Sequence, residues 1–363
     1  MGEIFSYAGM PRITLTIHRQ AFYLNLVIFG LMGPIYVFLL PSLPRQPETT
    51  FVQKLKSIDW LGTFLTAGLC VSFTLAFTFG GAIWPWSDGR VVACIMFFGF
   101  LTITFGVTQY YSVFTNKMDR LFPCEFVADP QLVLLYVCMA CGGAALFVSI
   151  YYIPFFFLFV HGDSGTKAAL RLLPFICFYV ATTLICGATM GRTGYHMVWY
   201  LVSGVFLTAG GAAMYTVHVD TAPANIYGYA ILLGIGMTTT QAGYAVGPLL
   251  VKPDRVAELI QFLNISQGSS QLIGLTIASA LFQSLTFPRL KTVLAETDYL
   301  DSEIQAALAG ARSTVLATTT PELRARCIDV IVQSIRSDWV LCITAGVLYT
   351  LCSCFLTPKR HVR

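Results

Sequence analysis

Residues 131–159 read QLVLLYVCMACGGAALFVSIYYIPFFFLF, and this stretch contains no charged side chain. A transmembrane helix needs roughly 20 apolar residues, so the run is long enough to cross a lipid bilayer. Over the whole chain 56% of the residues are hydrophobic and 11% are charged, whereas soluble domains carry about 25% charged residues. The sequence therefore predicts a polytopic membrane protein.

Further apolar stretches lie on both sides of this one, and together they predict an all-α membrane protein with about nine transmembrane helices. Each span should be helical, because lipid offers no hydrogen-bond partner for backbone N–H and C=O groups. The predicted spans are 22–40, 58–79, 90–111, 131–159, 168–190, 196–217, 226–251, 258–284 and 338–357.

The lysines and arginines of the loops predict the orientation of the chain. Eleven of them fall in one set of short loops and four in the other, and the richer set should face the cytosol. The C-terminus is then cytosolic, and the long segment 285–337 lies on the opposite side.

We expect the segment 285–337 to form amphipathic helices rather than disordered chain. Asp301 or Ser302 can cap one helix that ends near Gly310. A second helix should begin at Pro321, and it either lies on the membrane surface or runs into the last span.

Polar side chains recur every three or four residues along the span 258–284, and at this spacing they share one helix face. Such a stripe either hydrogen-bonds neighbouring helices or lines a wet cavity. We take the cavity as the working hypothesis. The candidate residues of a substrate cavity are Gln241, Tyr244, Asn264, Gln267, Gln271, Tyr152 and Arg171.

Arg171 is the clearest charged residue inside a predicted span, about one turn from its outer boundary. One interpretation is that its long side chain reaches the lipid headgroups. The other is that it places a positive charge at the outer mouth of a cavity. From the sequence, no buried carboxylate can be proposed as a proton carrier.

The sequence lacks the patterns of the common enzyme and metal sites. It contains no hydrolase triad, phosphate-binding loop or HExxH helix, and no acidic cluster beside the spans that could hold magnesium. Cys138 and Cys141 stand mid-span without a second pair, which argues against a zinc site. We therefore expect no enzyme, no metal, no other cofactor and no nucleic-acid partner.

Several segments resemble motifs of the fungal major facilitator drug:proton antiporters with fourteen helices. His18–Leu26 (HRQAFYLNL) resembles the W-R-x-x-F-Y-I-N-L-P segment that opens the sixth helix, although His18 and Gln20 replace its tryptophans. Lys56–Thr63 (KSIDWLGT) is similar to the start of the seventh helix, and Tyr151–Pro154 (YYIP) to the YYLP of the ninth. Phe262, Gln267 and Gly274 resemble the glutamine-rich thirteenth.

This resemblance covers nearly the whole chain beyond about residue 19 and implies the C-terminal portion of a major facilitator fold, without its first five helices. The implied parts are residues 1–57 with one helix of an N-terminal bundle, 58–130 with a linker helix pair, and 131–363 with a six-helix bundle that includes the loop 285–337. The resemblance also implies proton-coupled efflux of hydrophobic small molecules such as fungal secondary metabolites, toxins or drugs.

Transporters of this kind rock two bundles against each other around a central site. We therefore expect the chain to need the missing helices or a partner chain, and to be inactive in export by itself. The alternatives are a non-transporting membrane remnant that assembles with or regulates another transporter, and an integral-membrane enzyme. The expected location is the plasma membrane, with a vacuolar or other endomembrane as the alternative.

Overall fold

The computed structural model describes residues 23, 26–39, 55, 57–81, 83–117, 119–295, 299–309 and 320–357. The chain forms two compact units, residues 1–56 and 57–363, and each is described by itself. In the first unit, residues 26–34 are α-helical and Ile35–Leu39 form the π-helical turn η1. Most of the motif 18–26, most of the loop 41–57, and residues 358–363 lie outside the described residues.

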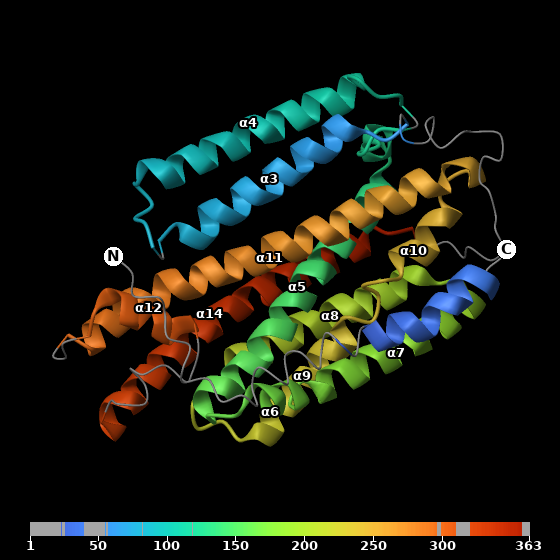
Figure 1. The fold of residues 1–363 in the computed structure, drawn as a ribbon. Helices are drawn as coiled ribbons and strands as arrows, with labels where there is room; N and C mark the ends of the chain where they lie inside the picture. Colours follow the sequence, from blue (N-terminus) through green and yellow to red (C-terminus); the bar gives the residue numbers. More distant parts are fainter. Residues whose placement is uncertain are drawn as a thin grey trace. The chain divides into compact units, whose positions relative to one another are not determined.

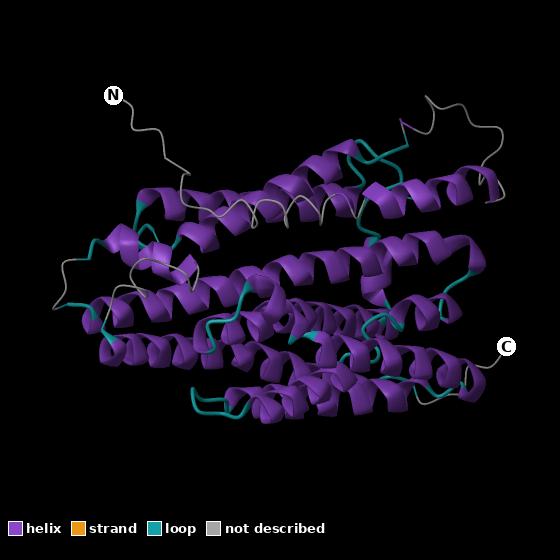
Figure 2. Ribbon diagram, turned by 60° about the horizontal axis from the view of Figure 1, so that its bottom comes forward, coloured by secondary structure: helices purple, strands orange, loops and turns teal. Residues whose placement is uncertain are grey.

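Long helices run back and forth through the second unit, and its described residues contain no β-strand (Figures 1 and 2). The elements are α3 (Trp60–Phe79), α4 (Gly89–Tyr111), η2 (Cys124–Ala128), α5 (Pro130–Val160), α6 (Gly165–Leu170), α7 (Leu173–Thr193), α8 (His196–Tyr215), α9 (Pro223–Gly236), α10 (Gly243–Val246), η3 (Gly247–Leu249), η4 (Pro253–Arg255), α11 (Val256–Val293), α12 (Asp301–Ala309) and α14 (Pro321–Cys354).

Seven helices of the described part are long and apolar enough to cross a membrane. They correspond to seven of the nine predicted spans, with ends that differ by a few residues, and confirm the all-α membrane class. The predicted span 168–190 is divided by a turn at residues 171–172 between α6 and α7, so Arg171 lies in this turn. The span 22–40 is described only in part. The remaining span, 226–251, differs from its prediction.

The prediction of one continuous helix over 226–251 is wrong. α9 ends at Gly236, and a series of turns follows before the short α10. Thr238 and Thr240 donate their hydroxyls to backbone carbonyls three residues earlier, at 2.5 and 2.6 Å, which competes with regular helix. Ser203 on α8 donates a hydrogen bond to the carbonyl of Gly236 at 2.5 Å. A neighbouring helix thus supplies the partner that this carbonyl lacks where α9 ends.

Both predicted helices of the segment 285–337 are present, as α12 and the first half of α14. Asp301 and Ser302 lie in the first turn of α12, where Glu303 accepts from the N–H of Leu300 at 3.1 Å, and Gly310 lies outside the described residues.

α14 begins at Pro321 and continues through the last span as one helix of 34 residues. Of the two alternatives, the second helix therefore runs into the last span. Cys327, Ile331 and Ile335 are buried along this half.

Glycines allow α8 to pack closely against α14 and α9. A Cβ atom at Gly346 would lie 2.6 Å from the hydroxyl oxygen of Thr208, and one at Gly236 would lie 2.5 Å from the backbone nitrogen of Leu207. Lipid gives little hydrophobic drive to helix association, so such small residues allow the van der Waals contact that holds membrane helices together.

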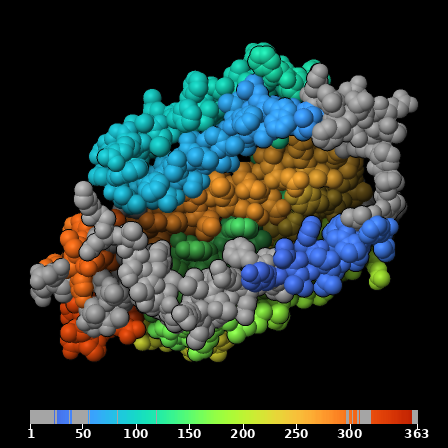
Figure 3. Space-filling view, viewed as in Figure 1, coloured from blue at the N-terminus to red at the C-terminus, as the bar shows by residue number. Residues whose placement is uncertain are grey.

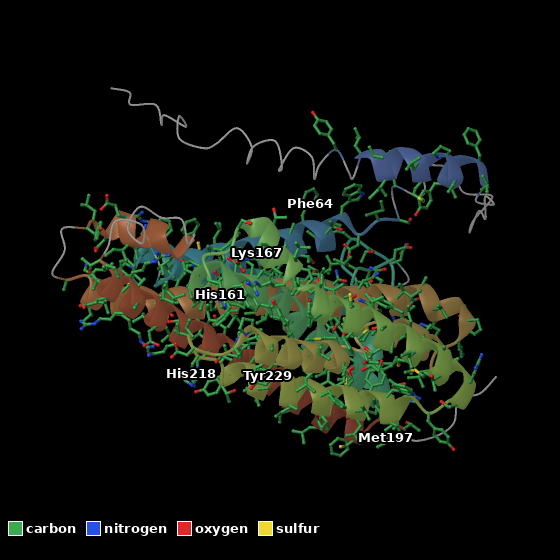
Figure 4. The ribbon with its side chains drawn as sticks, turned by 90° about the horizontal axis from the view of Figure 1, so that it is seen from below. Phe64, His161, Lys167, Met197, His218 and Tyr229 are labelled. Carbon is green, nitrogen blue, oxygen red and sulfur yellow. The ribbon has the colours of Figure 1, made fainter. Side chains whose placement is uncertain are left out.

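Consecutive long helices run antiparallel, so their connections gather at two ends of the unit. The Arg120 end contains residues 112–129 and 250–255, and the Asp163 end contains the turn 161–164 and α12. In Figure 4, His161, Lys167 and His218 lie at the Asp163 end and Met197 at the other.

Asp59 ties the α3–α4 pair together at the Arg120 end. Its carboxylate accepts hydrogen bonds from Gln109 Nε2 at 2.7 Å and from the backbone N–H groups of Gly62 and Leu121 at 2.7 and 3.0 Å. Gln261 of α11 donates to the carbonyl of Leu121 at 2.7 Å. These bonds anchor the pair to α11, along which α3 lies (Figure 3).

Replacing Asp59 by alanine tests this anchor against a matched helix cap. Asp88 caps α4 through Arg90 N–H at 2.8 Å and pairs with the Arg90 side chain at 3.6 Å, and both bonds are local. Among the described residues its carboxylate makes no tertiary hydrogen bond. We expect Asp59→Ala to lower the free energy of unfolding by about 1–3 kcal/mol more than Asp88→Ala, because it leaves buried partners unsatisfied. Thermal unfolding of the purified variants in detergent measures the difference, and equal losses would contradict the anchor.

Candidate functional site

Three of the predicted cavity residues meet in one polar cluster between α10 and α11. Tyr244 Oη lies 2.6 Å from Asn264 Oδ1 and 3.0 Å from Gln267 Oε1, and its single proton serves one of them at a time. Gln267 Nε2 is buried and has no hydrogen-bond partner among the described residues. Asn264 is exposed and Tyr244 and Gln267 are half-buried, so the cluster lies at the surface of the unit and keeps one unused donor at its buried end.

A second site is the aromatic pocket, a cavity of about 350 Å³ between α5, α11 and α12. Tyr152, another predicted residue, lies in its wall, and Ser279 and Gln283 add polar groups. Phe155 and Phe282 meet edge to face with their ring centroids 5.3 Å apart. The aromatic lining is formed by Tyr151, Tyr152, Phe155, Phe282 and Phe287.

The other predicted residues do not join these two sites. Gln241 lines a separate cavity of about 360 Å³ beside α7, where its amide lies next to Tyr179. Gln271 is half-buried on α11. The residues of the polar stripe therefore have different partners. Gln261 bonds the loop before α5, whereas Asn264 and Gln267 contact Tyr244.

Arg171 is held by its neighbours at the Asp163 end. Its guanidinium binds the Asp163 carboxylate, donates to Tyr227 Oη at 2.6 Å and lies over the Phe157 ring at 4.6 Å. The side chain therefore links the turn after α5 to α9 instead of extending freely toward headgroups.

Asp163 is the acidic centre of this link, and its side chain is 3% exposed. Burial by itself would raise the pKa of Asp163, but hydrogen bonds from Lys167 and Arg171 and their positive charges outweigh it, so the pKa is lowered. The ion pair is thus formed throughout the neutral range.

Asp338 is the residue that sequence reasoning missed. The expectation that the bundle holds no buried carboxylate is wrong, because this side chain is 0% exposed and lies beside Tyr152. The predicted span began at residue 338, so Asp338 counted as a boundary residue. The observed helix begins at Pro321, which carries the carboxylate far inside it. A charge within a continuous helix that enters the membrane is the signal that could have found it.

The chain is similar in sequence to known fungal transporters. No family model matches it. It is 58% identical over 344 residues to the efflux pump patC of Aspergillus clavatus, and 56% identical over 344 residues to the MFS-type transporter patC of Penicillium expansum; each match covers 94% of the chain and 63% of the relative. The chain thus spans less than two thirds of the length of these relatives. A crystal structure of a bacterial homologue of the human lysosomal transporter Spinster aligns with a TM-score of 0.47 at 17% identity, covering 81% of this chain and 64% of the other.

Substitution of Asp163 should produce a pH-dependent loss of stability. Because its folded-state pKa is lowered, its contribution is fully present above the ordinary carboxylate value of about 4 and is lost as the pH falls through the folded-state value. We expect Asp163→Asn to cost about 1–3 kcal/mol at pH 7 and progressively less in acid.

Lys167→Gln is the matched control, because the Lys167 side chain is 63% exposed. Exposed ion pairs contribute about 0–1 kcal/mol, so this variant should stay close to the wild type. Unfolding curves of all three proteins are measured from acidic to neutral pH. A loss of unfolding free energy in Asp163→Asn that did not change with pH would contradict the ion-pair role of Asp163.

Proposed function

Because the chain belongs by sequence to the fungal major facilitator transporters, we propose that it acts in the efflux of hydrophobic small molecules across a membrane. Its relatives bear the names efflux pump and MFS-type transporter. The family is one of transporters and not of enzymes, so the polar groups of the bundle are assigned to binding and not to catalysis.

The observation that carries this proposal is the unused donor of Gln267 beside Tyr244 and Asn264. Small-molecule sites combine mostly apolar walls with a few polar groups that fix orientation. A carbonyl or hydroxyl oxygen of a substrate would satisfy Gln267 Nε2, while apolar helix faces beside the cluster would contact its hydrocarbon part. The favoured substrate is therefore an uncharged, oxygen-bearing hydrophobic metabolite.

The proposed working arrangement follows the family. Residues 131–357 would form one bundle, 58–111 a linker pair, and 22–40 a helix of the opposite bundle. Secondary transporters of this kind alternate access around a site near the bilayer midplane. The excess of basic residues supports a cytosolic Arg120 end and C-terminus, proton coupling is carried over from the family, and the plasma membrane is the proposed location.

Transport in a yeast strain without its own drug exporters tests this function. The chain is expressed as it stands, which we expect to be inactive, and in parallel preceded by the N-terminal helices of the A. clavatus relative, which should restore export. Extrusion of the dye rhodamine 6G is the readout. We expect Gln267→Leu to reduce extrusion roughly tenfold at equal abundance, because one hydrogen bond to the substrate is lost.

The matched control is Gln333→Leu, which changes an exposed glutamine of α14 whose side chain, among the described residues, bonds only its own helix neighbour Asp329. It should extrude the dye like the wild type. Unchanged extrusion by Gln267→Leu would refute the assigned binding role, and disappearance of that variant from the membrane would assign Gln267 to helix packing instead.

A further inference from the structure

Asp338 occupies an unusual position on α14. Its side chain is 0% exposed, and neither carboxylate oxygen has a hydrogen bond of normal geometry among the described residues. The Tyr152 phenol of α5 lies beside it, and Cys342 follows one turn later on α14. Burying an ionised carboxylate without partners is very unfavourable, so the closed site favours the neutral carboxylic acid.

No positive charge offsets Asp338 from the helices that pack against α14. α5 contains no Asp, Glu, Lys or Arg, α8 contains none, and α11 has none between Glu258 and Arg289. α5 presents Tyr151 and Tyr152, and α11 presents the neutral Ser279 and Gln283 to the adjoining pocket.

The neighbouring cation on α14 itself, Arg336, is engaged elsewhere. Arg336 donates to the carbonyl of Tyr215 at 2.7 Å and lies 3.3 Å from His218 Nδ1. The described neighbours also supply no second carboxylate, and a metal ion would meet a single anionic ligand here. A proton is therefore the cation that suits this site.

Tyr152 connects the carboxylate to the aromatic pocket. It lines that cavity of about 350 Å³ on one side and touches Asp338 on the other, and it is itself 1% exposed. The cavity also reaches Ile83, in the connection between α3 and α4, and α12, which places it at the Asp163 end of the unit. A small movement of the Tyr152 ring would bring Asp338 into contact with the pocket.

We propose that Asp338 is a proton-binding site of this bundle, exchanging its proton with the aromatic pocket past the phenol of Tyr152. One proton binds one carboxylate oxygen and cancels one negative charge, and its release to the pocket restores the carboxylate. The use of this proton to drive export rests on the proposed function, whereas its binding does not.

Thermal unfolding of the purified chain between pH 5 and pH 9 tests proton binding directly. If the folded protein holds a proton on Asp338 that the unfolded chain releases, the unfolding equilibrium constant rises with pH by about tenfold per unit from this group alone. Asp338→Asn mimics the neutral acid and should lack this dependence. Asp301→Asn is the matched control, because Asp301 is exposed and pairs with Lys291 at 2.8 Å. This variant should retain the pH dependence of the wild type.

Parallel curves for the wild type and Asp338→Asn would overturn the proposal. If Asp338→Asn does not fold, Asp338→Glu keeps an ionisable group, and its curve decides: a retained pH dependence supports the proposal and a flat one overturns it.

Dye extrusion from vesicles then separates this proposal from the proposed function. In the form that transports rhodamine 6G, Asp338→Asn should abolish the response to a pH gradient, and Tyr152→Phe should weaken it. Full response in both variants would contradict the exchange route. If the wild type moves no dye, the proposed function fails, and the unfolding curves still decide whether Asp338 binds a proton.

Discussion

Close backbone contact between α14 and α8 is the constraint on which the rest of the bundle depends. Gly204, Gly211 and Gly346 line this contact, and each lacks room for a side chain without displacement of the opposite helix. Since lipid solvates apolar side chains as well as a protein core does, only such fitted contact holds the helices in a defined register. That register sets which groups of α14 face α5, and so it places Asp338 beside Tyr152.

The charges of the second unit divide between its ends and its interior. The ion pairs of the described residues lie at the ends, as in Arg120 with Glu125, Arg255 with Glu258, and Arg171 with Asp163. These pairs satisfy charges close to where water and headgroups are expected. Within the described part of the chain, Asp338 has no such partner, and Gln267 has an amide donor without an acceptor. A buried polar group without a hydrogen-bond partner lowers the stability of the fold, so we assign ligands to these two groups, a proton to Asp338 and a substrate oxygen to Gln267.

The lengths of the apolar stretches and the residues typical of helix starts were sufficient to predict most helices. Pro321 behind Thr320 predicted the start of α14, and Asp301 predicted α12, because both signals act on local backbone geometry. The break after Gly236 was missed, because apolar content does not report whether the hydroxyls of Thr238 and Thr240 bond their own backbone. Ser203, which satisfies the break, comes from another helix and is invisible to local patterns.

The site was predicted less completely than the fold. Helical spacing grouped Asn264 with Gln267 correctly, since both belong to one helix. Gln241 comes from another span, and the sequence does not show that it faces a different cavity. Arg171 was identified as a charge within a predicted span. Its partner Asp163 lies in the turn after α5, and the sequence does not show that this turn folds back toward Arg171. Asp338 was overlooked because counting apolar residues ends a span at a charge, whereas the helix itself continues.

Infrared difference spectroscopy tests the central claim most directly, since it detects the protonated carboxyl group of Asp338 itself. The purified chain is compared with Asp338→Asn at neutral pH, in H₂O and in D₂O. The account predicts a carboxylic acid C=O band that shifts in D₂O and is absent from Asp338→Asn. The absence of that band from the wild type would show that Asp338 is ionised in the folded protein, and it would contradict the account.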